Sequence, residues 1–133
     1  MLAAVALAAI ADVRVIGAGF GRSGTASLAA ALKELGHKVF HAEDSFENSG
    51  VWADLHVAAK SGDAAKVASA TEAAIDAVAD KGFTATTDFP TCTIFDGFLR
   101  RYPDAKVILT ERATPELWAE SFVATIARMT WIS

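Results

Sequence analysis

Arginine, serine and threonine side chains stand among closely spaced glycines in the segment 17–25, GAGFGRSGT. Glycine lets a backbone approach an anion without a Cβ in the way. The guanidinium of Arg22, the hydroxyls of Ser23 and Thr25 and the backbone N–H groups are the donors that a phosphate or sulfate accepts. These residues predict a loop that binds a compact anionic group.

The flanking sequence predicts the elements that position this loop. An apolar, β-branched run, 13–16, enters the glycines and is typical of a buried strand. The segment 26–35 is rich in helix formers, and Gly36 predicts its end. In a strand–loop–helix unit, the free N–H groups and the positive end of the helix dipole point at the anion.

The rest of the chain alternates between predicted strands and helices. Strands are predicted at 37–41, 83–89 and 106–110, the last as the clearest buried strand after the first; helices are predicted at 51–59, 64–80 and 91–102 and from Thr114-Pro115 onward, and 42–50 is predicted as a loop. Such alternation predicts a parallel sheet covered on both faces. The carboxyl ends of its strands meet at one edge, so Asp88 and Glu111-Arg112 are expected near the glycine loop.

Length and composition are those of one domain, residues 1–133. Hydrophobic residues make up 53% of the chain and the formal charge is −4, which gives no indication of bulk binding to nucleic acid or an anionic membrane. Cys92 is the single cysteine, and it predicts a small buried residue in a reducing, cytoplasmic compartment. The apolar segment 1–11 is too short to span a bilayer and is expected to be a helical or frayed extension.

Three phosphate-binding patterns can be compared with the glycine loop. The pattern of nucleoside triphosphate-binding P-loops, GxxxxGK[ST], is not matched, because Thr25 stands where the lysine should be. GxGxxG is matched by residues 19–24, and Glu43-Asp44 follow about 20 residues later, as in an NAD(P)-binding Rossmann oxidoreductase. The third pattern, arginine with two hydroxyls, suits a compact terminal phosphate or sulfate.

Three sequence blocks carry a family resemblance: GFGRSGTASL, TTDFP and YPDAKVILTERATPELWAESF. In this order they resemble the P-loop sulfotransferases, in the branch that reads G-F-G-R-T-G-T, then D-[FW]-P, then YPDAKVILT-x-R. The resemblance implies an α/β fold, a three-layer sandwich with a parallel sheet of the P-loop nucleoside triphosphate hydrolase-like type. Members of this type continue with further helices, so we expect a truncated, N-terminal part of a longer fold.

The resemblance also implies roles for residues. The donor would be 3′-phosphoadenosine 5′-phosphosulfate, the acceptor a hydroxyl or amine, and no metal would be needed. Arg22 would act on the departing phosphate and Asp88 would be the general base, while Arg112 and Ser121 would hold the 3′-phosphate. The full set expected to bind the nucleotide is Gly21, Arg22, Ser23, Gly24, Thr25, Ala26, Ser27, Arg112 and Ser121.

Several alternatives remain open at this point. Asp88 could instead cap the helix predicted after it, and Thr25 and Ser27 could be ordinary first-turn capping residues. Arg112 and Ser121 are nine residues apart, one more than in the family pattern. Either the loop bulges and both reach the site, or Ser121 turns away and a neighbour such as Glu120 faces it.

The remaining expectations concern partners and other side chains. His37, His41 and His56 have no metal-ligand spacing, and Trp52, Trp118 and Trp131 are expected in the core or at an interface. A truncated remnant without activity is the non-catalytic alternative. The acceptor and the oligomeric state, including a homo-oligomer, stay open.

Overall fold

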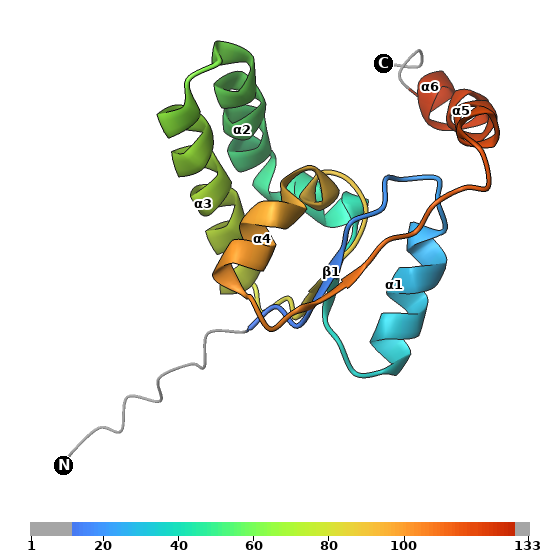
Figure 1. The fold of residues 1–133 in the computed structure, drawn as a ribbon, viewed down its shortest axis with the longest axis horizontal. Helices are drawn as coiled ribbons and strands as arrows, with labels where there is room; N and C mark the ends of the chain where they lie inside the picture. The colour runs from blue at the N-terminus through green and yellow to red at the C-terminus, as the bar shows by residue number, and fades with distance from the viewer. Residues whose placement is uncertain (1–11, 130–133) are drawn as a thin grey trace.

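Four short parallel strands form one sheet at the centre of the computed structural model, which describes residues 12–129 (Figure 1). The strands are β1 (Val15–Gly17), β2 (Val39–Phe40), β3 (Ala85–Thr86) and β4 (Lys106–Ile108). Their order is β2-β3-β1-β4, with Val15 level with Ala85 on one side and Lys106 on the other. The predicted parallel sheet is confirmed.

The strand order decides which residues meet the glycine loop. In a dinucleotide-binding Rossmann sheet, the second strand lies directly beside the first. Here β3 lies between β1 and β2. The end of β3, which carries Asp88, therefore adjoins the loop after β1, and Glu43 is one strand further away.

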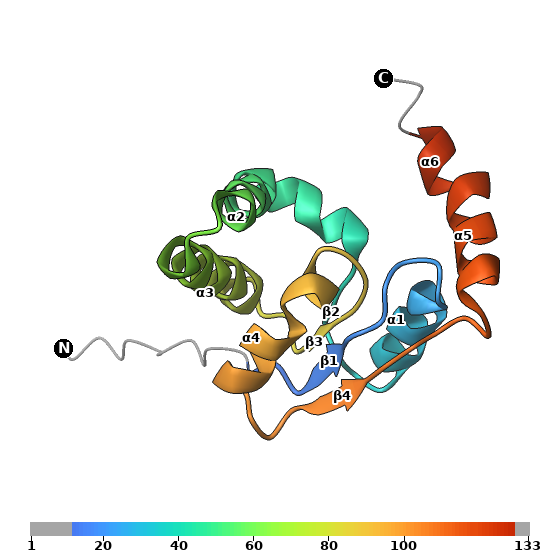
Figure 2. The ribbon, with the colours of Figure 1, turned by 45° about the horizontal axis from the view of Figure 1, so that its top comes forward.

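Helices cover both faces of the sheet, which makes the fold a three-layer α/β sandwich of the P-loop type (Figure 2). On one face α1 (Thr25–Glu34) packs Ala29 and Leu32 against the strands. The other face is covered by α2 (Ser49–Ser61), α3 (Ala64–Asp80) and α4 (Phe95–Arg101). The core on this side includes Ile16, Phe40, Leu55, Ile75, Val78, Phe83 and Phe98.

Helix boundaries follow the predicted signals. Gly36 and Gly82 have φ values of 88° and 80°, which suit glycine just after a helix. Gly62 ends α2, and Asp63 then caps α3 because its Oδ1 accepts from the N–H groups of Ala65 and Lys66. The helix predicted at 64–80 has the predicted bounds.

Several predicted segments differ from the structure, and the strand predicted at 37–41 contributes only Val39–Phe40 to the sheet. The segment 42–50, predicted as a loop, contains the 3-10 helix η1 (Ala42–Asn48), because Asp44 Oδ2 accepts from His41 N–H and starts a turn. The predicted helix 91–102 begins with the 3-10 helix η2 (Thr91–Ile94), where threonine hydroxyls bond to preceding carbonyls and tighten the chain. The predicted strand 83–89 contributes only Ala85–Thr86 to the ladder.

The prediction of a buried strand at 106–110 is wrong in its burial. Lys106 and Val107 are exposed, Ile108 is half-buried, and Leu109 is 60% exposed. The reason is the position of β4 at the edge of the sheet, paired only with β1. Within residues 12–129, Ile108 packs against the core beside α1, whereas Val107 and Leu109 stay exposed.

The C-terminal helices lie beside the start of α1, away from the sheet (Figures 1 and 2). They are α5 (Pro115–Ala124) and α6 (Ile126–Met129), and Thr114 caps α5 by accepting from Leu117 N–H. No helix within residues 12–129 has the length and apolar character needed to cross a bilayer. The expectations for segment 1–11 and for Trp131 lie outside the described residues.

Candidate functional site

The glycine loop turns the chain from β1 into α1. Gly24 precedes the helix with φ of 95°, a left-handed conformation that favours glycine, and no side chain caps the helix. The first helical bond runs from Leu28 N to Gly24 O, so the N–H groups of the first turn have no intrahelical partner. Thr25 and Ser27 are therefore not capping residues. Together with the dipole, this end of α1 favours an anion.

Two arginines converge on one serine beside this loop. Arg22 Nε donates to Ser121 Oγ at 3.0 Å, and Arg112 Nη2 donates to the same oxygen at 3.1 Å. Arg112 Nε also donates to the Arg22 carbonyl oxygen at 2.7 Å. The longer spacing between Arg112 and Ser121 thus still brings both residues to the loop.

The charges of this pair are not neutralised within the described part of the chain. Neither Arg22 nor Arg112 forms an ion pair with a carboxylate among residues 12–129. A planar guanidinium with free N–H groups suits a phosphate or sulfate oxygen. Arg22 itself has φ of 69°, so the loop backbone turns sharply at this side chain.

Trp118 fixes α5 to the loop. Its Nε1 donates to the Gly21 carbonyl oxygen at 2.8 Å, and its ring stacks on Phe122 with 5.2 Å between centroids. This contact holds Ser121 over the arginines. Trp118 lies between α5 and the glycine loop, whereas Trp52, expected in the core or at an interface, packs on Phe40 beside the core.

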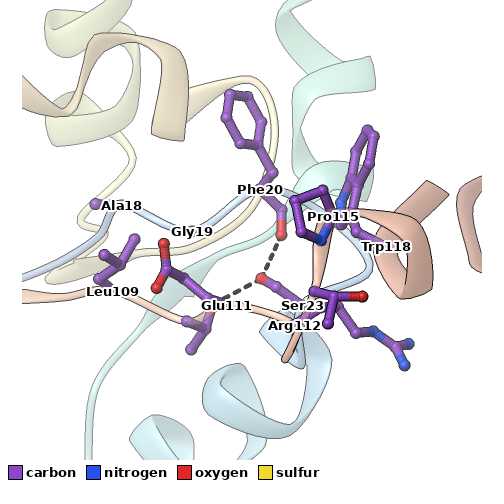
Figure 3. A pocket seen from close by; sticks show the side chains of 11 residues that line it. Ala18, Gly19, Phe20, Ser23, Leu109, Glu111, Arg112, Pro115 and Trp118 are labelled. Carbon is purple, nitrogen blue, oxygen red and sulfur yellow. Dashed lines mark hydrogen bonds between the residues drawn. The ribbon is translucent and has the colours of Figure 1, made fainter.

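A pocket of about 390 Å³ opens between the loop after β4 and the glycine loop (Figure 3). Leu109, Pro115 and Trp118 line it with apolar surface, and Arg112 stands at its border. Ser23 Oγ donates to the Phe20 carbonyl oxygen and lies 2.8 Å from Thr110 Oγ1. The Ser23 hydroxyl therefore closes the loop onto the end of β4.

Asp88 lies on the other side of the glycine loop. Asp88 is 8% exposed and has a backbone φ of 69°. Oδ1 accepts from Phe89 N–H at 2.6 Å, and Oδ2 accepts from the Thr25 hydroxyl at 3.2 Å. A Cβ on Gly21 would lie only 2.6 Å from Oδ1, so the carboxylate is held against the loop.

The alternative that Asp88 caps the following helix is wrong for its side chain. No side chain caps η2. The backbone carbonyl of Asp88 makes the local bonds instead, accepting from Cys92 N and from the Thr91 hydroxyl. The carboxylate itself faces Thr25 and Gly21.

His41 joins this group, and sequence reasoning missed it. His41 Nε2 lies 3.1 Å from Asp88 Oδ2, and Nδ1 contacts Glu43 Oε2. The hydrogen bond with His41 is the main cause that lowers the pKa of the Glu43 carboxyl. The available signal was the position of His41 at the carboxyl end of a predicted strand, where polar residues of a parallel sheet meet. Sequence reasoning also missed Thr110, although it too lies at the carboxyl end of a predicted strand.

Other predicted residues take peripheral places. Ala26 and Ser27 are exposed in the first turn of α1. Cys92 is buried as predicted, and burial followed by the charge of Asp88 raises the pKa of its thiol to about 11. Residues 12–129 contain no group of three or more histidine, cysteine or acidic side chains that could hold a metal ion.

Known proteins resemble this chain over most of its length. The family model described as a sulfotransferase domain matches residues 14–133. The Ava biosynthesis cluster protein M of Aspergillus versicolor is 33% identical over 117 residues, which cover 86% of this chain and 43% of that relative. The chain thus spans less than half the length of the relative.

Proposed function

Because this chain belongs to the sulfotransferase domain family, we propose that it binds 3′-phosphoadenosine 5′-phosphosulfate and directs its sulfuryl group to a hydroxyl or amine. The observation that carries the proposal is the convergence of Arg22 and Arg112 on Ser121, beside the uncapped start of α1. Three separate segments contribute to this one cationic site.

The donor set fits a ligand with two phosphate groups. The N–H groups that begin α1 and the Arg22 guanidinium suit the 5′-phosphate. Arg112 and Ser121 suit the 3′-phosphate, because a guanidinium fork matches a dianion. The adjoining 390 Å³ pocket has the apolar surface of Trp118 and Pro115, and small-molecule sites in proteins are commonly of this size and kind.

In an in-line transfer of the sulfuryl group, two residues of this chain would have separate roles. The bound donor supplies the sulfuryl group. Arg22 offsets the negative charge on the phosphate oxygen that keeps the electron pair of the broken S–O bond. Asp88 accepts the proton of the acceptor as its oxygen or nitrogen bonds to sulfur. The carboxylate and Arg22 both adjoin Gly21: Arg22 follows it in the chain, and Asp88 Oδ1 lies 2.6 Å from the position of a Cβ at Gly21.

Calorimetric titration with adenosine 3′,5′-bisphosphate tests the binding part of the proposal. Hydrogen bonds from charged groups contribute about 1.5–3 kcal/mol each, so Arg22→Ala together with Arg112→Ala should weaken binding at least about 100-fold. Arg100→Ala is the matched control, because Arg100 is exposed on α4 and pairs with Asp96. Unchanged affinity in the double variant would refute the site.

A parallel titration with NAD addresses the Rossmann alternative. The strand order places Glu43 one strand from the glycine loop, where it contacts His41. We therefore expect no binding of NAD at concentrations that saturate the bisphosphate site. Binding of neither nucleotide would favour the non-catalytic remnant.

A further inference from the structure

The hydroxyl of Thr25 is directed at Asp88, and both residues are buried. Thr25 Oγ1 donates to Asp88 Oδ2 at 3.2 Å, and the two residues are 5% and 8% exposed. Thr25 is also the first residue of α1, where the backbone N–H has no intrahelical partner. This one residue therefore offers its N–H to an anion and its side chain to a carboxylate.

The hydroxyls of the glycine loop are engaged by the protein itself. A threonine hydroxyl has one proton to donate, and the bond to Asp88 uses it. The hydroxyl of Ser23 likewise donates to the Phe20 carbonyl oxygen and lies 2.8 Å from Thr110 Oγ1. The two hydroxyls thus tie the loop to the ends of β3 and β4, and the N–H groups and Arg22 are left for the anion.

Thr25 provides the hydrogen bond that ties the Asp88 side chain to another segment within residues 12–129. Oδ1 accepts from the N–H of Phe89, the next residue in the chain. His41 Nε2 lies 3.1 Å from Oδ2 without a hydrogen bond to it. A Cβ at Gly21 would lie 2.6 Å from Oδ1, so the loop backbone limits the carboxylate on that side. The position of Oδ2 therefore depends on the start of α1.

We propose that Thr25 is a positioning residue that couples the anion site to Asp88. A phosphate on the first N–H groups of α1 orders the residue whose hydroxyl holds Oδ2, so an occupied anion site fixes the carboxylate. A general base must lie within hydrogen-bond reach of the proton that it takes, and a small displacement of a catalytic group is costly. The inference rests on the proposed function for the role of Asp88 as base, whereas the direction of the Thr25 hydroxyl does not.

Carbon-13 spectra of the aspartate carboxyl groups test the contact on the full chain without nucleotide. Thr25→Val removes the hydroxyl but keeps a similar shape, and Thr25→Ser retains the hydroxyl. We expect the Asp88 signal, identified by its absence in Asp88→Asn, to shift in Thr25→Val and to return toward its original position in Thr25→Ser. The control is Thr71→Val, at a threonine that is 6% exposed in α3, and it should leave the signal unchanged.

The same spectra test the coupling when adenosine 3′,5′-bisphosphate is added. We expect saturation with this ligand to move the Asp88 signal in the unmodified chain and in Thr25→Ser, and to move it less in Thr25→Val. In calorimetry, Thr25→Val should bind the bisphosphate within about 2-fold of the unmodified chain, whereas a hydroxyl that donated to the phosphate would be worth about 10-fold or more.

A reciprocal measurement leaves Thr25 unchanged. Its buried, bonded hydroxyl proton should exchange slowly with solvent in the unmodified chain and rapidly in Asp88→Gly, which suits the φ of 69° at that position. Equal exchange in both proteins, an Asp88 signal unmoved in Thr25→Val, equal ligand-induced shifts, or a 10-fold loss of affinity in Thr25→Val would overturn the inference. If the bisphosphate does not bind the unmodified chain, the proposed function fails, and the spectra of the free chain still decide whether Thr25 holds Asp88.

Discussion

Replacing Gly21 with alanine tests whether the Asp88 carboxylate is held against the glycine loop. Gly21 has no left-handed φ, so its backbone conformation is open to alanine. The added Cβ would lie 2.6 Å from Asp88 Oδ1 and 3.6 Å from Cγ. The obstacle is therefore a single carboxylate.

The loss of unfolding free energy in Gly21→Ala depends on how firmly the Asp88 carboxylate is held. An ordinary contact needs about 3.4 Å, so Oδ1 or the loop must move by roughly 0.8 Å. Phe89 N–H donates to Oδ1 at 2.6 Å, the Thr25 hydroxyl donates to Oδ2 at 3.2 Å, and His41 Nε2 lies 3.1 Å from Oδ2. A shift of that size weakens these contacts, and overpacking of this kind costs about 1–3 kcal/mol of unfolding free energy.

A double-mutant cycle in urea, followed by tryptophan fluorescence, measures the effect. Asp88→Gly removes the carboxylate and suits the φ of 69° at that position. In this background, Gly21→Ala should cost less than about 0.5 kcal/mol, because its obstacle is gone. Gly50→Ala is the control, since nothing lies within 4 Å of a Cβ at Gly50 in α2.

The cycle can contradict the structure in two ways. An equal cost of Gly21→Ala in both backgrounds would mean that Asp88 is not its neighbour. A Gly21→Ala protein as stable as the unmodified chain would mean that the carboxylate is free to move, and the argument for a fixed base would fail.

Three further predictions test other parts of the molecule. Ser121→Ala should weaken binding of adenosine 3′,5′-bisphosphate about 10-fold in calorimetry, because Arg22 and Arg112 lose the oxygen that orients both; a ratio near one would show that they are positioned without it. Burial raises the pKa of the Cys92 thiol to about 11, against 9.0 for an ordinary thiol. The resulting contribution to the unfolding free energy is fully present below pH 9 and is lost as the pH rises toward 11. The unfolding free energy should therefore fall by about 2 kcal/mol relative to Cys92→Ala over that window, and parallel pH curves would contradict this. Asp63→Ala should destabilise the protein by about 1 kcal/mol in urea, because Asp63 caps α3; no change in the midpoint would show that the cap contributes nothing.

The sequence predicted the elements of the site better than their contacts. Val13 to Ile16, the glycines and the helix formers after Thr25 carry strong local signals, so the strand–loop–helix unit was correct. Short strands and 3-10 turns were less predictable, because side-chain bonds such as that of Asp44 to His41 N–H decide them. Exposure of Val107 and Leu109 was also unpredictable, since an apolar run does not reveal that its strand lies at an edge.

The sequence by itself determined which glycines and donor side chains share the loop between the first strand and the first helix, because these are local properties of the chain. Only the tertiary structure decided which distant residues meet there. Placing β3 beside β1 set Asp88 against Gly21, and docking α5 through Trp118 set Ser121 between two arginines. The pairing of His41 with Asp88 depends on β2 lying next to β3. Such contacts follow from strand order, which is chosen by the packing of the whole core and not by any one segment.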